Sequence, residues 1–534
     1  MASVAQVIAK RLHEAGVRHA FGIPGGEVLS LVDALVEIGI RFVLVKHENC
    51  GGFMAEGVHH SNGAPALLVT TVGPGLANAV NVVANAQQDR VPLILLTGCI
   101  DPPAAHTYTH QWLDQNALLK PITKASFVAD ADSIHVVVDK ALAIALDDPP
   151  GPVHIDVPVS VGNSDAPKRE PVRRSRPVRG AAYGGPLDVA REWLDAAKRP
   201  VVISGIEAIN NGAAADIQKF IRQFNIPLIT TYKAKGILPE DDPLALGGAG
   251  LSPVADAILL PIVNASDCVI LAGYDPIEMR GGWRDPWSTD AHVIELSAVP
   301  NTHYVHRARL SLLGDVGGSL RALGRGLAGN STWNTDDIEE HRNALRAVFR
   351  PDEDWGPAAI VDTARRVLPR ETIATVDSGA HRILLSQVWE AYGPRELLQS
   401  NGFCTMGCAL PLAMGAKIAD PNRPVVAFTG DGGLDMVLGE LTTARDMELP
   451  VIVIVFADRS LALIEMKQRG TGYQNAAVDF PPTDYTVLAR ALGGDGYNCR
   501  NRDDLESALN QALQTKHFSI VACEFPRAAY DGRI

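Results

Sequence analysis

Short apolar runs alternate with helix-period segments along almost the whole chain. In the first third, amphipathic segments separate β-branched-rich runs, which are HAFGIPG, RFVLVKHE, PALLVTTVG, VPLILLTG and PVHIDVP. Strands that alternate with helices in this way pair in parallel, because each helix returns the chain to the same edge of the sheet. The alternation therefore predicts a mostly parallel sheet with helices on both faces.

The same alternation recurs twice more, which predicts an α/β fold of three domains. A second block contains RPVVISG, IPLITTY, CVILAG and HVIEL, and a third contains TIATVDS, PVVAFTG, VIVIVFAD and FSIVACEF. The 534 residues of the chain are too many for one core. We predict domains over residues 1–165, 186–345 and 356–534, because residues 164–185 are rich in Pro, Arg and Gly and residues 325–355 are polar.

Composition and charge exclude several classes of protein. Apolar residues make up 46% and charged residues 20% of the chain, as in ordinary globular proteins. A net charge of −13 predicts no nucleic-acid partner, and we interpret the local basic run 168–179 as a solvated linker. The chain lacks an apolar run of about 18 residues, so no membrane span is expected. The N-terminus looks like an amphipathic helix and not a signal peptide. The seven scattered cysteines predict neither disulfides nor a zinc site, which fits a cytoplasmic protein.

Two acidic residues each follow an apolar run of the third block. Residues 425–429 and 451–456 have the continuous apolar character of strands buried on both faces, and a helix-period segment, 434–448, lies between them. This order predicts a βαβ unit in which Asp431 and Asp458 lie at the carboxyl ends of two parallel strands. Ligands bind at that edge of open α/β sheets.

Glycines flank the first of these acids and allow a ligand to approach the backbone closely. Gly430, Gly432 and Gly433 surround Asp431, and the free N–H groups of a turn that opens a helix can hold a phosphate. Two carboxylates would repel a diphosphate unless a Mg²⁺ ion lay between them, since Mg²⁺ takes carboxylate, carbonyl and phosphate oxygens together. The Walker pattern is absent. From spacing alone, a metal–diphosphate site and an ordinary polar turn both remain open.

With its other motifs considered, the chain resembles a known enzyme superfamily. GDG at 430–432, followed by an oxygen ligand at Asp458, is similar to the thiamine-diphosphate motif of acetohydroxyacid synthases and pyruvate decarboxylases. Further similar motifs follow in the family's order: FGIPGG (21–26), HE (47–48), GPGLAN (73–78), THQWLDQNALLKPITK (109–124), KGILPEDDP (235–243), GYDPIE (273–278) and NGFCTMGCALPLAMGA (401–416). The resemblance spans essentially the whole chain and is nearest in motifs to catabolic acetolactate synthase. It implies a pyrimidine-binding first domain, a middle domain and a diphosphate-binding third domain.

The resemblance implies that the chain binds thiamine diphosphate and Mg²⁺. Asp431, Asp458 and the backbone carbonyl of Ser460 would hold the metal ion, and Ala457 stands where the family has Asn. Glu48, which we expect at the end of the strand RFVLVKHE, matches the family's catalytic glutamate that contacts the pyrimidine ring. The remaining cofactor-binding residues implied by the match are Pro24, Gly25, Asn78, Cys404 through its carbonyl, Met406 as the wedge that bends the cofactor, Gly430, Gly432, Gly433 and Leu461.

The resemblance also suggests residues that meet the substrate. His110 and Gln111 would be catalytic residues lining the site above the thiazolium ring, where pyruvate decarboxylases have a His-His pair, and this difference favours carbon–carbon ligation. Gly26, His381 and Lys467 are candidate substrate contacts. Lys467 stands where branched-chain biosynthetic synthases have a tryptophan, so it would pair with an anionic acceptor, although a solvated helix lysine is the alternative.

Three histidines and two cysteines near these motifs are interpreted without a catalytic role for their side chains. His59 and His60 are interpreted as surface residues at a helix end, and His47 as a neighbour of Glu48. Cys404 and Cys408 are interpreted as small core side chains.

The implied reaction is decarboxylation of a pyruvate-like 2-ketoacid followed by carboligation. The alternative is a non-oxidative 2-ketoacid decarboxylase of the benzoylformate type or another thiamine lyase, and a non-catalytic homologue is disfavoured by the intact Glu48, Asp431 and Asp458. FAD is a further option that we do not expect, since the middle domain has no reliable short flavin signature. In this superfamily the glutamate and the GDG motif come from different subunits, which implies at least a homodimer with the site at the subunit interface and favours a homotetramer.

Overall fold

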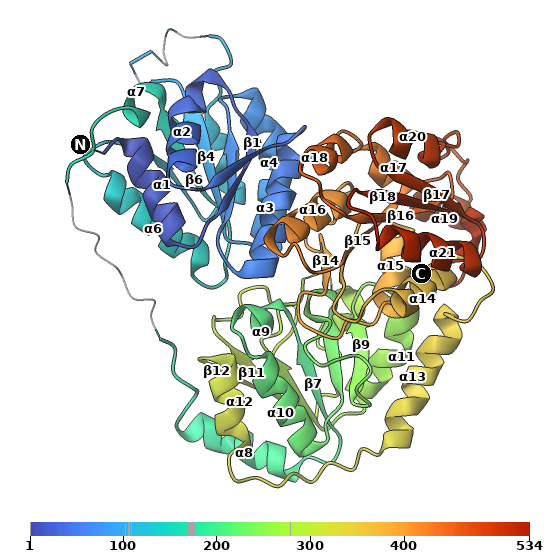
Figure 1. Cartoon of the computed structure of the whole chain (residues 1–534). Coiled ribbons are helices and arrows are strands. Elements are labelled where there is room, and N and C mark those ends of the chain that lie inside the picture. The colour runs from blue at the N-terminus through green and yellow to red at the C-terminus, as the bar shows by residue number, and fades with distance from the viewer. Residues whose placement is uncertain (1, 102, 105–106, 108, 169–177, 278) are drawn as a thin grey trace.

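The computed structural model describes residues 2–101, 103–104, 107, 109–168, 178–277 and 279–534 (Figure 1). It contains three six-stranded sheets, and every pairing between the described strands is parallel. The predicted α/β fold with three domains is confirmed. None of the helices in the described residues is long and apolar enough to cross a membrane. Most of the predicted linker 168–179 lies outside the described residues.

The first sheet has the strand order β2-β1-β3-β4-β6-β5. Its strands are β1 (His19–Ile23), β2 (Arg41–Leu44), β3 (Ala66–Thr70), β4 (Leu93–Cys99), β5 (Ala125–Val128) and β6 (Val153–Pro158). The accompanying helices are α1 (Val4–Glu14), α2 (Leu29–Glu37), α3 (Glu48–Asn62), α4 (Pro74–Gln88), α5 (Gln115–Leu119), α6 (Ile134–Leu146) and α7 (Val159–Gly162). The central strand β3 is buried along its whole length, as its continuous apolar sequence predicts.

The second sheet has the order β12-β11-β10-β7-β8-β9. Its strands are β7 (Pro200–Ser204), β8 (Leu228–Thr231), β9 (Ala245–Ala249), β10 (Cys268–Ala272), β11 (His292–Ser297) and β12 (Leu310–Leu313). Its helices are α8 (Gly185–Ala196), α9 (Ile206–Asn210), α10 (Ala214–Phe224), α11 (Pro253–Asn264) and α12 (Val316–Gly324), and the short 3-10 helix η3 (Tyr232–Ala234) follows β8. Helix α13 (Thr335–Phe349) then leads toward the third domain (Figure 1).

The third sheet has the order β14-β13-β15-β16-β18-β17. Its strands are β13 (Ile373–Val376), β14 (Leu397–Gln399), β15 (Val425–Gly430), β16 (Ile452–Ala457), β17 (Asp495–Cys499) and β18 (Ser519–Glu524). Its helices are α14 (Pro357–Val367), α15 (Ala380–Val388), α16 (Ala409–Ala419), α17 (Asp431–Asp435), α18 (Glu440–Asp446), α19 (Ala462–Thr471), α20 (Tyr485–Ala491) and α21 (Arg502–Ala512).

The first and third domains share one hydrophobic core. Helix α3 packs against α16, and a single cluster of buried side chains runs from the first sheet into the third. Two glycines allow this close approach, because a Cβ added to Gly57 would lie 2.3 Å from the Leu412 carbonyl oxygen and one added to Gly415 would lie 2.0 Å from that of Met54. The two domains therefore stand side by side, with the middle domain below both (Figure 1).

Two local predictions near this junction are wrong. Strand β2 ends at Leu44, and Glu48 begins helix α3 instead of ending a strand, since the His47 side chain caps the helix by accepting from the Asn49 N–H. The segment 434–448 is not one helix, because α17 ends at Asp435 and α18 begins at Glu440. After the break between α17 and α18, the Glu440 carboxylate accepts from two main-chain N–H groups of the first domain.

The interpretation of His59 and His60 as surface residues is also wrong. Both lie inside the α3 packing, where His59 Nδ1 is 2.8 Å from the Ala64 carbonyl oxygen and His60 Nε2 is 3.2 Å from a Glu56 carboxylate oxygen. Burial lowers the pKa of both histidines well below its ordinary value. The sequence did not reveal this because α3 is covered on several sides and lacks one polar face.

Candidate active site

Asp431 and Asp458 lie at the same edge of the third sheet. Strands β15 and β16 are direct neighbours, with Gly430 opposite Phe456, and each acid follows the carboxyl end of its strand. The predicted βαβ geometry at this edge is therefore confirmed. Because both strands end together, the two carboxylates face one place in the fold.

A bound cation would stabilise the ionised form of both carboxyl groups. Asp431 is buried and accepts from the main-chain N–H of Gly432 (2.9 Å) and of Arg459 (2.7 Å). Burial raises the pKa of Asp431 to about 6, and burial together with the charge of Asp431 raises the pKa of Asp458 to about 8. Arg527, whose charge favours ionised Asp458, forms its own ion pair with Asp479. Two carboxylates that share a site and form no ion pair with a base in the described part of the chain are suited to a metal ion.

The donor set at this edge fits Mg²⁺ together with a diphosphate. The described residues contain no cluster of three or more His, Cys, Asp or Glu side chains able to hold a metal. An ion between Asp431 and Asp458 would thus need main-chain and ligand oxygens as well, which is the mixed oxygen set that Mg²⁺ accepts beside phosphates. Ala457, where the family has Asn, lines a small cavity that Asp431 also lines.

The raised pKa of Asp458 predicts how the stability of the metal-free protein depends on pH. A carboxyl group whose pKa is raised by folding binds its proton more readily in the folded state, so the free energy of unfolding falls as pH rises from about 4 through about 8. Urea unfolding of metal-free wild type and Asp458→Asn at about pH 5 and about pH 9 should show the wild type losing a few kcal/mol relative to the variant, on the order of the pKa shift. An unchanged difference at the two pH values would contradict this.

Asp377 connects the glycine turn to the loop that precedes α16, and sequence reasoning missed it. It follows β13, is buried, and accepts from the N–H groups of Gly407 (2.9 Å) and Cys408 (3.0 Å) and from the Thr429 hydroxyl (3.1 Å). A Cβ added to Gly433 would lie 2.2 Å from Asp377 Oδ2, so only glycine fits there. The sequence signal for Asp377 was TIATVDS, an apolar run followed by an acidic residue, like the runs that precede Asp431 and Asp458.

The loop before α16 presents Cys404 and Met406 beside this edge. Cys404 is exposed in a left-handed backbone conformation (φ 56°), with its Sγ 3.2 Å from Ser378 Oγ, whereas Cys408 is buried. The interpretation of Cys404 as a core side chain is therefore wrong, because its backbone turns it outward. A Cβ added to Gly432 would lie 3.1 Å from Leu461 and 3.8 Å from Met406 Cε, so both side chains lie over the GDGG turn.

Two other candidate residues of the third domain, His381 and Ser460, lie near the same turn. His381, near the start of α15, is buried and stacks on Phe456, with ring centroids 5.2 Å apart, and burial lowers its pKa to about 3. Its ring contacts the glycine turn, since a Cβ on Gly430 would lie 3.3 Å from it. Ser460 is buried and its hydroxyl donates to Asp479, while Lys467 is exposed on α19.

A second group of candidate residues lies at the carboxyl edge of the first sheet. Glu48 is buried, and its Oε2 accepts from the Asn78 side chain at 3.0 Å. A Cβ added to Gly75 would lie 3.3 Å from Glu48 Oε1. The GPGLAN turn, which begins α4, thus holds the carboxylate from two sides. Fixing a buried carboxylate in this way prepares it to hydrogen-bond one ligand group.

Two loops complete this first-domain group. Pro24, Gly25 and Gly26 follow β1, where a Cβ on Gly25 would lie 2.4 Å from Thr71 Oγ1. His110 and Gln111 lie in an exposed loop, and the Gln111 carbonyl oxygen would be 2.3 Å from a Cβ on Gly73 of GPGLAN. The loop that holds the predicted substrate-facing residues therefore rests on the turn that holds Glu48.

Direct contacts connect the two groups within one chain. The Glu440 carboxylate of α18 accepts from the N–H groups of Lys46 (2.8 Å) and His47 (3.0 Å), immediately before Glu48. The Asn81 side chain of α4 donates to both Asn49 (3.0 Å) and Thr405 (3.1 Å). The segments that carry Glu48 and Met406 are thereby tied to each other.

Comparison with known proteins identifies the three domains. Family models match residues 2–118 as the N-terminal TPP binding domain, 187–323 as the central domain and 377–523 as the C-terminal TPP binding domain of thiamine pyrophosphate enzymes. The chain is 29% identical to the acetolactate synthase of Bacillus subtilis, over 96% of this chain and 91% of the relative. It is 30% identical to a probable acetolactate synthase large subunit of Methanocaldococcus jannaschii (95% and 89%). It is 27% identical to the catabolic acetolactate synthase of Raoultella terrigena (97% and 94%).

Proposed function

The chain belongs to the thiamine-diphosphate-dependent acetohydroxyacid synthase family of 2-ketoacid decarboxylases and carboligases, and from this premise we propose that it decarboxylates a pyruvate-like 2-ketoacid and joins the remaining acyl group to a second carbonyl compound. With pyruvate in both roles the product is acetolactate. The observation that carries the proposal is the Asp431–Asp458 edge, with pKa values raised to about 6 and about 8, in a chain that also buries Glu48 against Asn78.

The metal and diphosphate are assigned to the edge of the third sheet. Asp431, Asp458 and the Ser460 carbonyl would hold Mg²⁺, and the main-chain N–H groups of the GDGG turn would face the diphosphate. The contact between Asp377 and Gly433 supports this assignment, because it leaves the turn no freedom to move away from the loop before α16.

The catalytic roles follow from what each side chain is able to reach. Bound thiamine diphosphate supplies a nucleophilic carbon and takes up the electron pair released when carbon dioxide leaves. Glu48 keeps one oxygen on Asn78 and has the other to hold a proton at the pyrimidine ring. Met406 and Leu461 exclude water over the turn, and His110 and Gln111 orient the substrate. Lys467, exposed on α19, would bind the carboxylate of the acceptor.

FAD does not fit the middle domain, and no step involves it. Ligands of such sheets bind where the strand order reverses, here between the carboxyl ends of β7 and β10. Those two ends close on each other, since a Cβ on Gly205 would lie 2.6 Å from the Asp275 nitrogen. The half-buried Glu207 carboxyl accepts from Ser297 Oγ at 3.0 Å beside them, and desolvation raises its pKa to about 7. Above about pH 7 this group is ionised and repels a diphosphate, so we expect protein purified at that pH to be colourless.

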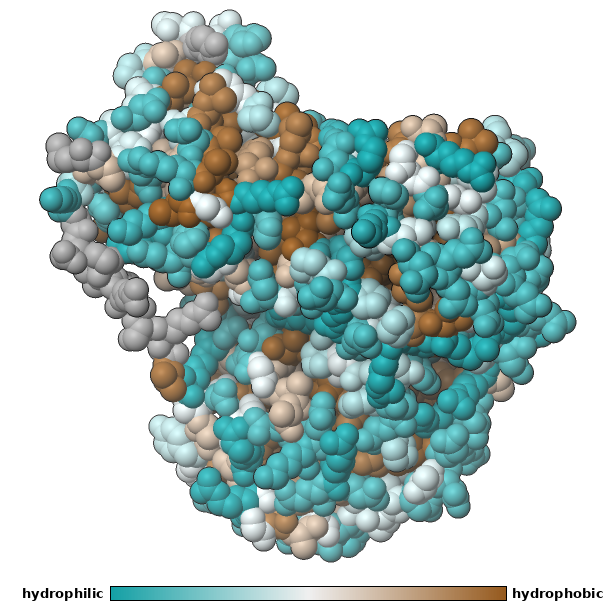
Figure 2. Space-filling view, in the orientation of Figure 1, coloured by the Kyte–Doolittle hydropathy of each residue, from teal (hydrophilic) through white to brown (hydrophobic). Residues whose placement is uncertain are grey.

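Assembly with a second copy is part of the proposal. Large apolar side chains are exposed close to the candidate residues, namely Leu44, Trp112, Phe403, Met436 and Ile464. Figure 2 shows apolar residues gathered over the first domain and along its boundary with the third. A face of this kind is suited to a partner subunit, so a homodimer would be the minimum unit, with a homotetramer built from it. All seven cysteines are free, which supports a cytoplasmic location.

A panel of 2-ketoacids tests the activity. The protein is supplied with thiamine diphosphate and Mg²⁺, and both carbon dioxide release and the products are measured with and without aldehyde acceptors. We expect acetolactate or another ligation product from pyruvate. Aldehyde without any ligation product would instead assign the chain to the simple decarboxylases, and no carbon dioxide from any member would contradict the proposal.

A further inference from the structure

One polar face of helix α4 runs from Glu48 to the middle domain. Along α4 and its C-terminal cap, Asn78, Asn81, Asn85 and Asp89 are spaced three, four and four residues apart, which places them on one side of the helix. We call this row the α4 polar row. It has contacts with all three domains, and the proposed function uses only its first member.

The α4 polar row holds the loop 400–406 at two places besides the Asn81–Thr405 contact. Ser400 Oγ donates to Asn85 (2.6 Å) and accepts from the Thr405 N–H (3.1 Å), so it links the helix to the inside of the loop. The Asp89 carboxylate accepts from the N–H groups of Asn401 (3.0 Å) and Gly402 (2.7 Å). The loop that presents Cys404 and Met406 is thus fixed at its base by side chains of the first domain.

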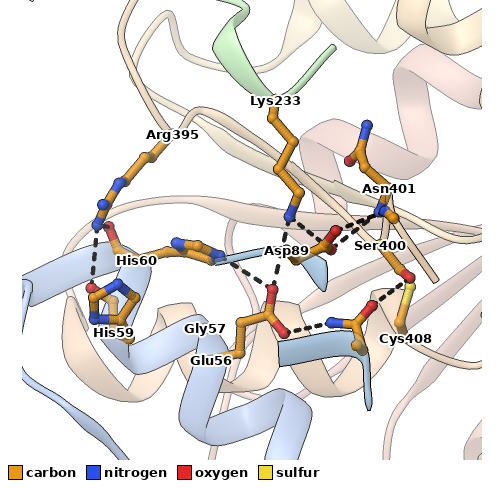
Figure 3. Close-up of polar contacts among 12 residues, drawn as sticks. Glu56, Gly57, His59, His60, Asp89, Lys233, Arg395, Ser400, Asn401 and Cys408 are labelled. Carbon is orange, nitrogen blue, oxygen red and sulfur yellow. Dashed lines mark hydrogen bonds and ion pairs between the residues drawn. The ribbon is translucent and has the colours of Figure 1, made fainter. Parts of the chain in front are cut away.

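The middle domain contributes one buried cation to this row. Lys233, in η3, places its Nζ 2.8 Å from an Asp89 oxygen and 3.9 Å from Glu56, while Glu56 accepts from Asn85 at 3.0 Å. Figure 3 shows Lys233 reaching from the middle domain to both carboxylates, with Asn401 on the far side of Asp89. The side chains of Lys233, Asp89, Glu56 and Asn85 are all buried. Breaking such a pair leaves uncompensated charge inside the protein, so the carboxylates must take up protons or rearrange when Lys233 is lost, and either change alters the bonds they make.

We propose that Lys233 is a positioning residue of the cofactor site: by holding Asp89 and Glu56, it keeps the α4 polar row in place and so fixes the loop 400–406. The proposal rests on the proposed function, which assigns Cys404 and Met406 of that loop to thiamine diphosphate. It makes the middle domain, which provides none of the predicted cofactor contacts, a determinant of cofactor affinity.

The chain offers a matched control for Lys233. Lys235 lies two residues later, is also buried, and forms an ion pair with Glu240 at 2.6 Å, but its pair contacts the Ala391 N–H and not the loop 400–406. Lys233→Met and Lys235→Met should both lower thermal stability. A second pair avoids buried charge: Ser400→Ala removes the link to the loop, and Ser386→Ala removes a buried hydroxyl that donates to Gln399 instead.

Two measurements on the full-length protein test the proposal. Thiamine diphosphate is titrated, at saturating Mg²⁺, into protein stripped of cofactor, and hydrogen–deuterium exchange is followed over residues 400–408 of the stripped protein. Lys233→Met and Ser400→Ala should weaken binding about tenfold or more and speed exchange in that segment, as loss of an outer-shell contact does. Lys235→Met and Ser386→Ala should stay within about twofold of wild type.

Equal binding and equal exchange in each variant and its control would overturn the proposal. If Lys233→Met does not fold, the Ser400 and Ser386 pair decides alone. If wild type itself fails to bind thiamine diphosphate, the proposed function is wrong, and the exchange measurement still decides whether the loop depends on Lys233 and Ser400.

Discussion

Replacing Glu48 by glutamine is expected to lower kcat for 2-ketoacid decarboxylation by about two to three orders of magnitude. Glutamine keeps the shape of the side chain and can still bond Asn78, whose side chain contacts Glu48 at 3.0 Å. It cannot hold a proton for the pyrimidine ring, so only the chemical role is removed. The rate of carbon dioxide release at saturating cofactor measures the effect.

A buried carboxylate elsewhere provides the control for this variant. Glu295 lies on β11 and bonds His306 (2.8 Å) and Ser311 (2.8 Å), far along the chain from the candidate residues. Glu295→Gln should cost stability and leave kcat within about twofold of wild type. If Glu48→Gln kept wild-type turnover, Glu48 would not be the catalytic carboxylate.

The second large effect is expected for Asp431→Asn, which should weaken Mg²⁺-dependent binding of thiamine diphosphate by about a hundredfold. Asn keeps the bond from the Gly432 N–H through its carbonyl oxygen, loses the bond that the Arg459 N–H donates to the other Asp431 oxygen, and removes the charge that balances the metal. Asp435 lies four residues later on α17 and is exposed, so Asp435→Asn is the control for lost charge on the same helix. Equal cofactor affinity in the two variants would remove Asp431 from the metal site.

The fold was predictable because its signal is local. A run of apolar residues, a helix-period segment and another run define each βαβ unit, and consecutive parallel strands usually pair. For that reason the sequence predicts Asp431 and Asp458 at the carboxyl ends of two parallel strands, and the structure shows these strands to be neighbours. The predicted strand was too long because the apolar run continues to Val45, whereas the pairing of β2 with β1 stops at Leu44.

The missed parts of the site depend on contacts between distant segments. Asp377 follows β13, which pairs with β15, but β14 lies between them in the chain, so the sequence does not reveal that neighbour. The spacing of the asparagines on α4 was visible, yet two of their partners, Thr405 and Ser400, come from the third domain. The burial of His59 and His60 likewise results from the packing of α3 on α16. The residue pattern of α3 alone does not predict that packing.

The most direct test of the account is an equilibrium titration of the cofactor-stripped protein with thiamine diphosphate, with Mg²⁺ and with a chelator. We expect saturable binding of about one cofactor per chain in Mg²⁺. Removing the metal should weaken this binding about tenfold or more, because the carboxylates of Asp431 and Asp458 then repel the diphosphate. Absence of binding in Mg²⁺, or equal affinity with and without the metal, would contradict it.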